Sequence, residues 1–177
     1  MHNRGSVLLV IVLAALCVRA QDEAAEEEDL DVFRPRPAPG LRRPPEPTYP
    51  SVAFSVRKAR TDSGPGTRVE FEDVLTNGGE GWDTRNNEFV APYDGFYFFI
   101  FHAVSAFNSD FTMALNLNDR YQVTAYGKSS DYEHGSNSAV LNLERGDRVS
   151  LQLEQGIIYE HPGNEAYTTF SGFLIYT

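Results

Sequence analysis

The chain has 177 residues, with 15 lysines and arginines against 25 aspartates and glutamates, which gives a formal net charge of −10. This acidity argues against a nucleic-acid-binding protein, because such a protein presents a basic face. The 14 glycines follow no Gly-X-Y repeat, which excludes a collagen triple helix, and the single cysteine excludes an intramolecular disulfide. The 12 phenylalanines and nine tyrosines favour β-strands around an apolar core.

Residues 1–20 are predicted to be a secretory signal peptide. Arg4 supplies the positive charge, Val7–Leu16 is a ten-residue apolar stretch, and small residues precede a cleavage site after Ala20. A membrane-spanning helix needs about 20 apolar residues, so this stretch is too short to be an anchor. The protein is therefore expected to be secreted, and its only cysteine, Cys17, is lost with the peptide.

Residues 21–50 are predicted to be a disordered tail. Asp22–Asp31 holds seven acidic residues in ten, and seven prolines with interspersed arginines follow between Pro35 and Pro50. Self-repelling charge and dense proline prevent both helix and sheet. Such a tail serves as a spacer or as a docking strip for a partner, or it is solvated without a specific partner, which is the interpretation we favour.

From Ser51 to Thr177 the pattern changes to short strands with period-two alternation. In each of these strands every second residue is apolar and faces the core, while polar residues lie between. No amphipathic helix interrupts the pattern, so an antiparallel β-sandwich is the expected class. The alternating apolar residues include Val52, Phe54, Val56, Val69, Phe71, Met113, Leu115, Leu117, Val149, Leu151 and Leu153.

Two segments break the alternation, because Phe96–Phe101 and Phe170–Tyr176 are apolar at nearly every position. A strand with two apolar faces needs cover on both sides. In a two-layer sandwich only one face of each sheet meets the core, so the second face is expected to be a subunit interface. These segments therefore predict an oligomer.

Eight residues of this region have a spacing that resembles the signature of the complement C1q globular-head family, in the tumour necrosis factor-like superfamily. They are Phe71, Asn77, Trp82, Phe89, Gly95, Tyr97, Phe99 and Phe101. The resemblance covers residues 51–177 and implies a ten-stranded antiparallel jelly-roll β-sandwich that assembles as a homotrimer. The aromatic residues expected to form its core and trimer contacts are Phe71, Trp82, Phe89, Tyr97, Phe99, Phe101, Phe170, Phe173 and Tyr176.

The sequence contains no motif of an enzyme: no Gly-x-Ser-x-Gly, no glycine-rich phosphate loop, no His-Glu-x-x-His and no cysteine cluster. We therefore expect no catalytic activity. The tripeptide Arg145-Gly146-Asp147 has the form of an integrin motif, but it lies between two predicted strands. Because glycine and aspartate are what a tight turn requires, a turn is the favoured interpretation.

Calcium is the one cofactor that the resemblance suggests, because relatives bind it through acidic residues in the loop that here spans residues 127–134. Asp131 and Glu133 are the only acidic residues of that loop. Calcium takes 6–8 oxygen ligands, so two carboxylates fall short of a complete site. A solvated loop remains the favoured alternative.

The loop from Gly156 to Thr169 mixes aromatic and polar side chains, as adaptable recognition surfaces do. Its candidate ligand-binding residues are Tyr159, Glu160, His161, Asn164, Glu165 and Tyr167. The resemblance implies an extracellular ligand, which is a glycan, a microbial surface or a receptor. Lectin-like pattern recognition in innate immunity is the favoured function. The alternative is a precerebellin- or cytokine-like signalling ligand for a cell-surface receptor.

Overall fold

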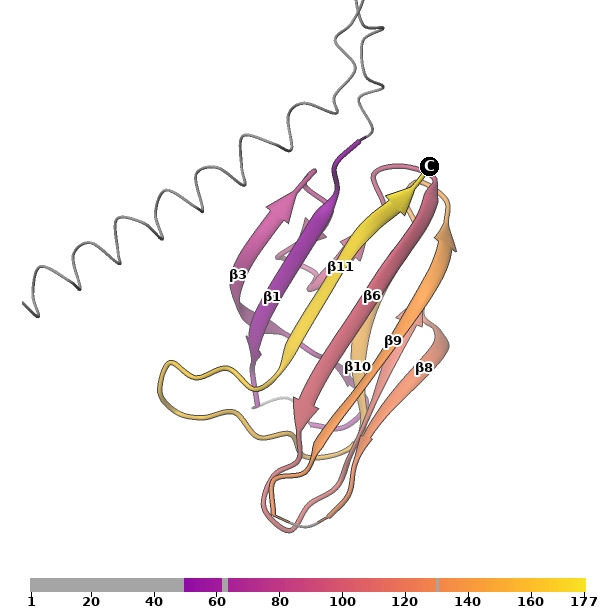
Figure 1. Ribbon diagram of the computed structural model, residues 1–177. Coiled ribbons are helices and arrows are strands. Elements are labelled where there is room, and N and C mark those ends of the chain that lie inside the picture. Colours follow the sequence, from indigo (N-terminus) through magenta and orange to yellow (C-terminus); the bar gives the residue numbers. More distant parts are fainter. Residues whose placement is uncertain (1–49, 62–63, 130) are drawn as a thin grey trace, which may run out of the picture. The chain divides into compact units, whose positions relative to one another are not determined.

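The computed structural model describes residues 50–61, 64–129 and 131–177 (Figure 1). The predicted signal peptide and residues 21–49 of the predicted tail lie outside them. Within the described residues the chain forms eleven β-strands and no helix. This part of the chain accordingly holds no helix with the length and hydrophobicity that crossing a membrane requires.

The strands form two sheets in which every pairing is antiparallel. The first, called the β6 sheet, has the order β3 (Phe71–Gly78), β1 (Ala53–Ala59), β11 (Thr169–Tyr176), β6 (Gly95–Val104) and β9 (His134–Leu143). The second, called the β7 sheet, has the order β4 (Trp82–Asp83), β5 (Glu88–Val90), β10 (Arg148–Gly156), β7 (Phe111–Leu117) and β8 (Arg120–Gly127), with β2 (Thr67–Arg68) also paired to β10.

This arrangement confirms the predicted all-β jelly roll. Among the described residues there is one strand more than the ten that the resemblance implies, and two of the eleven, β2 and β4, are only two residues long. Both ends of the described domain lie at the same end of the sandwich (Figure 1). The loops that follow β6 and precede β9 lie at the opposite end, which we call the loop end.

In strand β6 the uniformly apolar segment Phe96–Phe101 has one face in the core and one face outside it. Tyr97, Phe99 and Phe101 point into the core and are fully buried, whereas Phe96 and Phe98 on the other face are only half-buried. The alternation predicted for Val52, directly before β1, and for Phe54 and Val56 within β1 is confirmed as well, since all three are buried.

The core is an aromatic stack around Phe54 of β1. Its ring centroid lies 5.0 Å from that of Trp82, 5.1 Å from Phe89 and 4.9 Å from Phe170. Gly172 of β11 is the cross-strand partner of Phe54 in β1. A Cβ added to this glycine would lie 2.8 Å from the Phe54 ring. The absent side chain of Gly172 therefore makes room for the stack.

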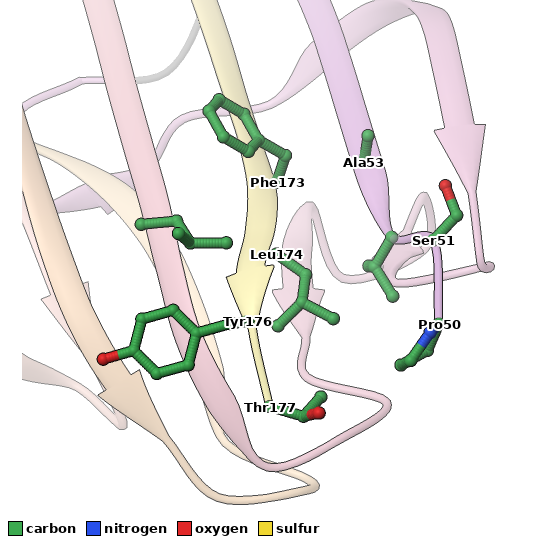
Figure 2. Close-up of a pocket in the computed structure, with 9 residues that line it drawn as sticks. Pro50, Ser51, Ala53, Phe173, Leu174, Tyr176 and Thr177 are labelled. Carbon is green, nitrogen blue, oxygen red and sulfur yellow. The ribbon is translucent and has the colours of Figure 1, made fainter. Parts of the chain in front are cut away.

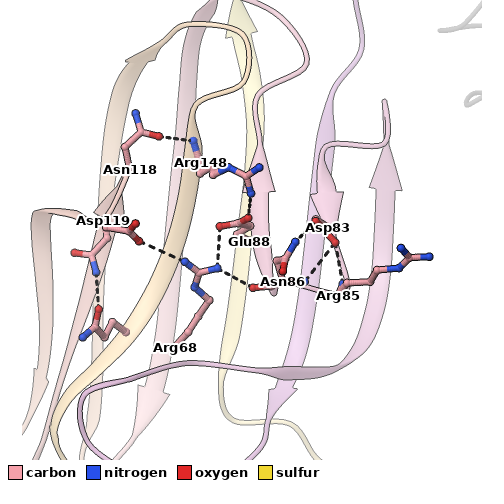
Figure 3. Close-up of polar contacts among 10 residues, drawn as sticks. Arg68, Asp83, Arg85, Asn86, Glu88, Asn118, Asp119 and Arg148 are labelled. Atoms are coloured by element: carbon pink, nitrogen blue, oxygen red, sulfur yellow. Dashed lines mark hydrogen bonds and ion pairs between the residues drawn. The ribbon is translucent and has the colours of Figure 1, made fainter.

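An ion-pair network stabilises the outer side of the β7 sheet (Figure 3). Glu88 is almost completely buried, and its two carboxylate oxygens accept hydrogen bonds from Arg68, at 2.8 Å, and from Arg148. Arg68 also lies 3.4 Å from the carboxylate of Asp119 in the β7–β8 turn. Because a buried carboxylate needs partners, this network joins β2, β5 and β10 as a structural unit.

Candidate functional site

The face of the β6 sheet that points away from the core, called the outer face, carries exposed aromatic and aliphatic side chains. The Phe98 and Phe173 rings lie 5.4 Å apart, and Phe96 stacks on Tyr176 with centroids 4.8 Å apart. Phe173 is 47% exposed, Tyr176 54% and Val140 57%. A contiguous patch of this kind is typical of a protein–protein interface.

Toward the loop end the outer face becomes polar. The hydroxyl groups of Ser55 and Ser171 lie 2.9 Å apart in its middle. Further along, the imidazoles of His102 and His134 are stacked with centroids 5.4 Å apart. Burial, together with the neighbouring His134, lowers the pKa of His102 from its usual 6.5. The apolar character of this face is therefore concentrated near the termini.

A hollow of about 540 Å³ adjoins the apolar part of the outer face (Figure 2). It lies between the start of β1 and the end of β11, with Pro50 and Ser51 on one side and Phe173 and Tyr176 on the other. Its walls hold no acidic, basic or histidine side chain among the described residues. It is therefore a continuation of the apolar surface.

The loop end carries a second candidate site, built from aromatic rings of three loops. Neighbouring rings follow one another with centroids 6.2 Å apart for Phe107 and Tyr132, 4.7 Å for Tyr132 and Tyr159, and 5.8 Å for Tyr159 and Tyr167. His161 meets Tyr167 edge-on at 6.3 Å. Three of these tyrosines and Val104 line a hollow of about 410 Å³, which we call the aromatic hollow.

The fully buried Ser105, directly after β6, holds these loops together. Its hydroxyl accepts a hydrogen bond from the backbone N–H of Glu133 at 3.0 Å, and its own N–H donates to the Glu133 carbonyl at 2.9 Å. Ser105 also forms a β-bridge with Ile158, and the N–H of Tyr159 donates to the carbonyl of Val104 at 2.8 Å. This network of hydrogen bonds places the loop of Tyr132 against the loop of Tyr159.

Glu160 fixes the loop after β10 from within. Its carboxylate accepts hydrogen bonds from three backbone N–H groups, those of Ala59 at 3.2 Å, Tyr167 at 3.1 Å and Thr168 at 2.6 Å. The ammonium group of Lys58 donates to the carbonyls of His161, at 3.1 Å, and of Gly163. Glu160, predicted as a ligand-binding residue, therefore has its oxygens occupied by the loop's own backbone.

Glu165 and Tyr167 form a polar pair at the edge of the aromatic hollow. The Tyr167 hydroxyl donates to Oε2 of Glu165 at 2.8 Å, and the same oxygen lies 3.9 Å from Nδ1 of His161. The hydrogen bond to Glu165 raises the pKa of Tyr167, and the charges of Glu165 and Glu160 raise it further. The electrostatic potential around the Tyr167 ring is therefore negative.

The two residues predicted to hold calcium lie next to the aromatic hollow. Asp131 and Glu133 are both exposed. Across the described ranges, no group of three or more acidic, histidine or cysteine side chains could hold a metal ion. Asn164 is exposed at the tip of the loop after β10. The calcium site remains a prediction.

Residues Arg145–Asp147 form the turn between β9 and β10. The Asp147 carboxylate accepts one hydrogen bond from the N–H of Glu144 at 2.9 Å and another from the side chain of Asn118 at 2.8 Å. Gly146 has a φ of 94°, which favours glycine. Both oxygens of Asp147 are therefore engaged by the turn itself.

Three residues of the loop end were not singled out from the sequence: Ser105, Phe107 and Tyr132. Phe107 and Tyr132 are aromatic residues within turn-rich segments, where an exposed ring does not contribute to the core. Their position in the sequence therefore indicates candidate binding residues. Ser105 carried no such signal, because a serine after a strand is common in any loop.

Comparison with known proteins identifies the family. The C1q domain profile matches residues 53–175. The chain belongs to the C1q domain family. Its members are generally secreted, non-enzymatic proteins whose domains form trimers and bind extracellular ligands.

Individual relatives agree with this assignment. Caprin-2 of Danio rerio is 41% identical over 132 residues, a region that makes up 71% of this chain and only 14% of Caprin-2. The globular domain of zebrafish complement 1qA superimposes with a TM-score of 0.56 at 26% identity, covering 71% of this chain and 98% of that one. Murine APRIL, at 12% identity and a TM-score of 0.52, covers 71% of this chain and 99% of its own, and shares the fold.

Proposed function

We propose that the protein is a secreted homotrimer that binds an extracellular ligand through the loops at its loop end. The observation that carries the trimer is the apolar outer face of the β6 sheet. Phe173, Tyr176 and Val140 are each about half exposed in one copy of the chain, although they are large apolar residues. Trimerisation, which is general in the family, supplies the cover that this face lacks.

Association through the outer face leaves the loop end available for a ligand. Ser105 and Glu160 hold the backbone of the loops that carry its aromatic and acidic side chains, so the surface is ordered before a ligand arrives. Preorganisation of this kind lowers the entropic cost of binding. Three copies of a weak site on one trimer add avidity, which suits repetitive microbial or cellular surfaces.

Lectin-like pattern recognition in innate immunity is therefore the function we favour. The alternative is a precerebellin- or cytokine-like signalling ligand for a cell-surface receptor. The two differ in what the loop end meets: a repeated surface group or one protein receptor.

The trimer is tested by replacing Phe98 with aspartate. Phe98 lies opposite Val140 on the outer face and packs on Phe173. Phe98→Asp should convert the trimer to a monomer in sedimentation and light-scattering measurements, because three carboxylates would be buried in one interface. Tyr121→Asp, at a 63% exposed tyrosine of β8, is the control and should stay trimeric. A wild-type chain that sediments as a monomer overturns the proposal.

Recognition is tested on arrays of glycans and bacterial surfaces, with the purified trimer in the presence and absence of calcium. We expect binding to at least one class of surface group. Uniform failure on these arrays, together with saturable binding to cultured cells that is abolished by protease treatment of the cells, favours the signalling alternative. Calcium belongs to the mechanism only if chelation lowers the array signal.

A further inference from the structure

We propose that the aromatic hollow is a binding site for an alkylated ammonium group, such as the trimethylammonium head of choline. This inference rests on the proposed role of the loop end in ligand binding and names the ligand chemistry. The hollow of about 410 Å³ has the size of a small-molecule site. Its walls are the rings of Tyr132, Tyr159 and Tyr167, with Val104 between them.

The rings are arranged as a cradle rather than as a packed core. Tyr132 and Tyr159 meet at an interplanar angle of 58° with centroids 4.7 Å apart, while Tyr159 and Tyr167 are closer to parallel, at 28°. Tyr132 is 49% exposed, so its ring is accessible to a ligand. The electron-rich faces of tyrosines attract cations within about 6 Å of the ring centroid.

Tyr132 occupies its place at a cost in backbone conformation. Its φ is 57°, in the left-handed region that a residue with a bulky side chain rarely adopts. Strain of this kind persists where the surrounding structure enforces it, and it is concentrated at ligand-binding sites. Here the enforcing contacts are two hydrogen bonds between Ser105 and Glu133, the residue after Tyr132: the Ser105 N–H donates to the Glu133 carbonyl, and the Glu133 N–H donates to the Ser105 hydroxyl.

The charge around the hollow favours a cation. Glu165 holds the Tyr167 hydroxyl, and both Glu165 and Glu160 act electrostatically on that ring. The ammonium group of Lys58 is directed to the carbonyls of His161 and Gly163. The domain as a whole carries 17 acidic and 9 basic residues between positions 51 and 177.

The hydrogen-bonding groups favour a cation without N–H donors over a sugar or a primary amine. The Tyr167 hydroxyl is donated to Glu165, the Glu160 carboxylate accepts three backbone N–H groups, and the Ser105 hydroxyl is engaged with Glu133. Because these three groups are already engaged, they do not match several sugar hydroxyls or the three donors of a lysine ammonium. A quaternary ammonium group needs only ring faces and negative potential.

The experiment is a calorimetric titration of the intact trimer with choline, and in parallel with its uncharged isostere 3,3-dimethylbutan-1-ol. Galactose, N-acetylglucosamine and arginine methyl ester form the remaining arms. We expect choline to bind with a millimolar or lower Kd, and the isostere to bind at least tenfold more weakly. Equal binding of choline and its isostere, tighter binding of a sugar or of the arginine ester, or no choline binding at all overturns the inference.

Variants localise the effect. Tyr159→Leu should weaken choline binding at least fivefold, because it removes the ring that contacts both neighbours. Glu165→Gln should weaken it about threefold while leaving the loop folded. Tyr121→Leu, at an exposed tyrosine of β8, should leave choline binding unchanged, and an equal loss in this control contradicts the assigned position.

The same variants separate this inference from the proposed function. If the trimer binds an array surface but not choline, and Tyr159→Leu leaves array binding intact, only the aromatic hollow is wrongly assigned. If the wild-type trimer binds choline but no surface on the arrays or on cells, the site stands and the recognition function fails.

Discussion

Replacing Glu160 with glutamine should release the loop after β10 while the rest of the domain stays folded. The carboxylate of Glu160 accepts three backbone hydrogen bonds, two at Oε1 from Ala59 and Thr168 and one at Oε2 from Tyr167. Glutamine keeps one acceptor oxygen and places an NH₂ group where the second oxygen was. At least one N–H therefore loses its partner and faces another donor.

The magnitude follows from these three contacts. A hydrogen bond to a charged group contributes about 1.5–3 kcal/mol and a neutral one about 0.5–1.5 kcal/mol, so two bonds weaken by about 1 kcal/mol each and the third is lost. Because Glu160 is only half-buried, solvent compensates part of this loss. We expect a net effect of about 2–3 kcal/mol on opening of the loop, which corresponds to about 30- to 150-fold faster amide exchange.

Hydrogen–deuterium exchange checks this directly. The amides of Tyr167 and Thr168 should lose protection in Glu160→Gln, while those of β6 keep theirs. Glu165→Gln is the matched control in the same loop, because its carboxylate accepts the Tyr167 hydroxyl and no backbone N–H among the contacts described. The reasoning is refuted if exchange in Glu160→Gln stays within threefold of wild type, or if Glu165→Gln accelerates it equally.

Three further predictions concern the scaffold. Gly172→Ala should destabilise the domain by about 1–3 kcal/mol and lower Tm by roughly 4–12 °C, because the new Cβ would lie 2.6 Å from a core ring, whereas Gly64→Ala, with open space around it, should not lower Tm. Glu88→Gln should cost about 2 kcal/mol in urea unfolding, since two arginines lose their buried charged partner, and an unchanged midpoint would contradict this. Because the pKa of His102 is lowered from 6.5, the unfolded chain binds more protons below that pH, so stability should be complete above pH 6.5 and fall as the pH drops below it. His102→Gln should flatten that fall in thermal scans from pH 8 to pH 5, and an identical slope would contradict the assignment.

The fold could be predicted from the sequence to the extent that side-chain periodicity defines it. Alternation identified the inward residues of β1, and the spaced aromatic residues identified the family. In Phe96–Phe101 every position is apolar, so periodicity predicts two covered faces without saying which residues meet the core. The structure decides this, because Tyr97 and Phe99 are fully buried in the core, whereas Phe98 on the opposite face is only half-buried.

The loop end could be predicted only in part. Composition alone pointed to Tyr159 and Tyr167, which do line the aromatic hollow. Composition gave Glu160 the same standing, but its carboxylate accepts backbone N–H groups of Tyr167 and Thr168 in its own loop and of Ala59, about a hundred residues away in the sequence. Tyr132 joins the hollow through Ser105, again by a long-range contact. Contacts of this kind arise from the packing of loops, and no local pattern encodes them.

The outer face of the β6 sheet is apolar near the termini and polar toward the loop end, where the aromatic hollow lies. Near the termini, Phe98 and Phe173 offer apolar area that favours tight association in the proposed trimer. Toward the loop end the outer face carries the polar side chains of Ser55, Ser171 and His102. Each contact there contributes less to the free energy of association. Association energy concentrated at one end fixes the trimer without requiring the loops to pack against a neighbouring copy. The loop end then keeps its own internal supports, and its ring positions can serve ligand binding rather than assembly.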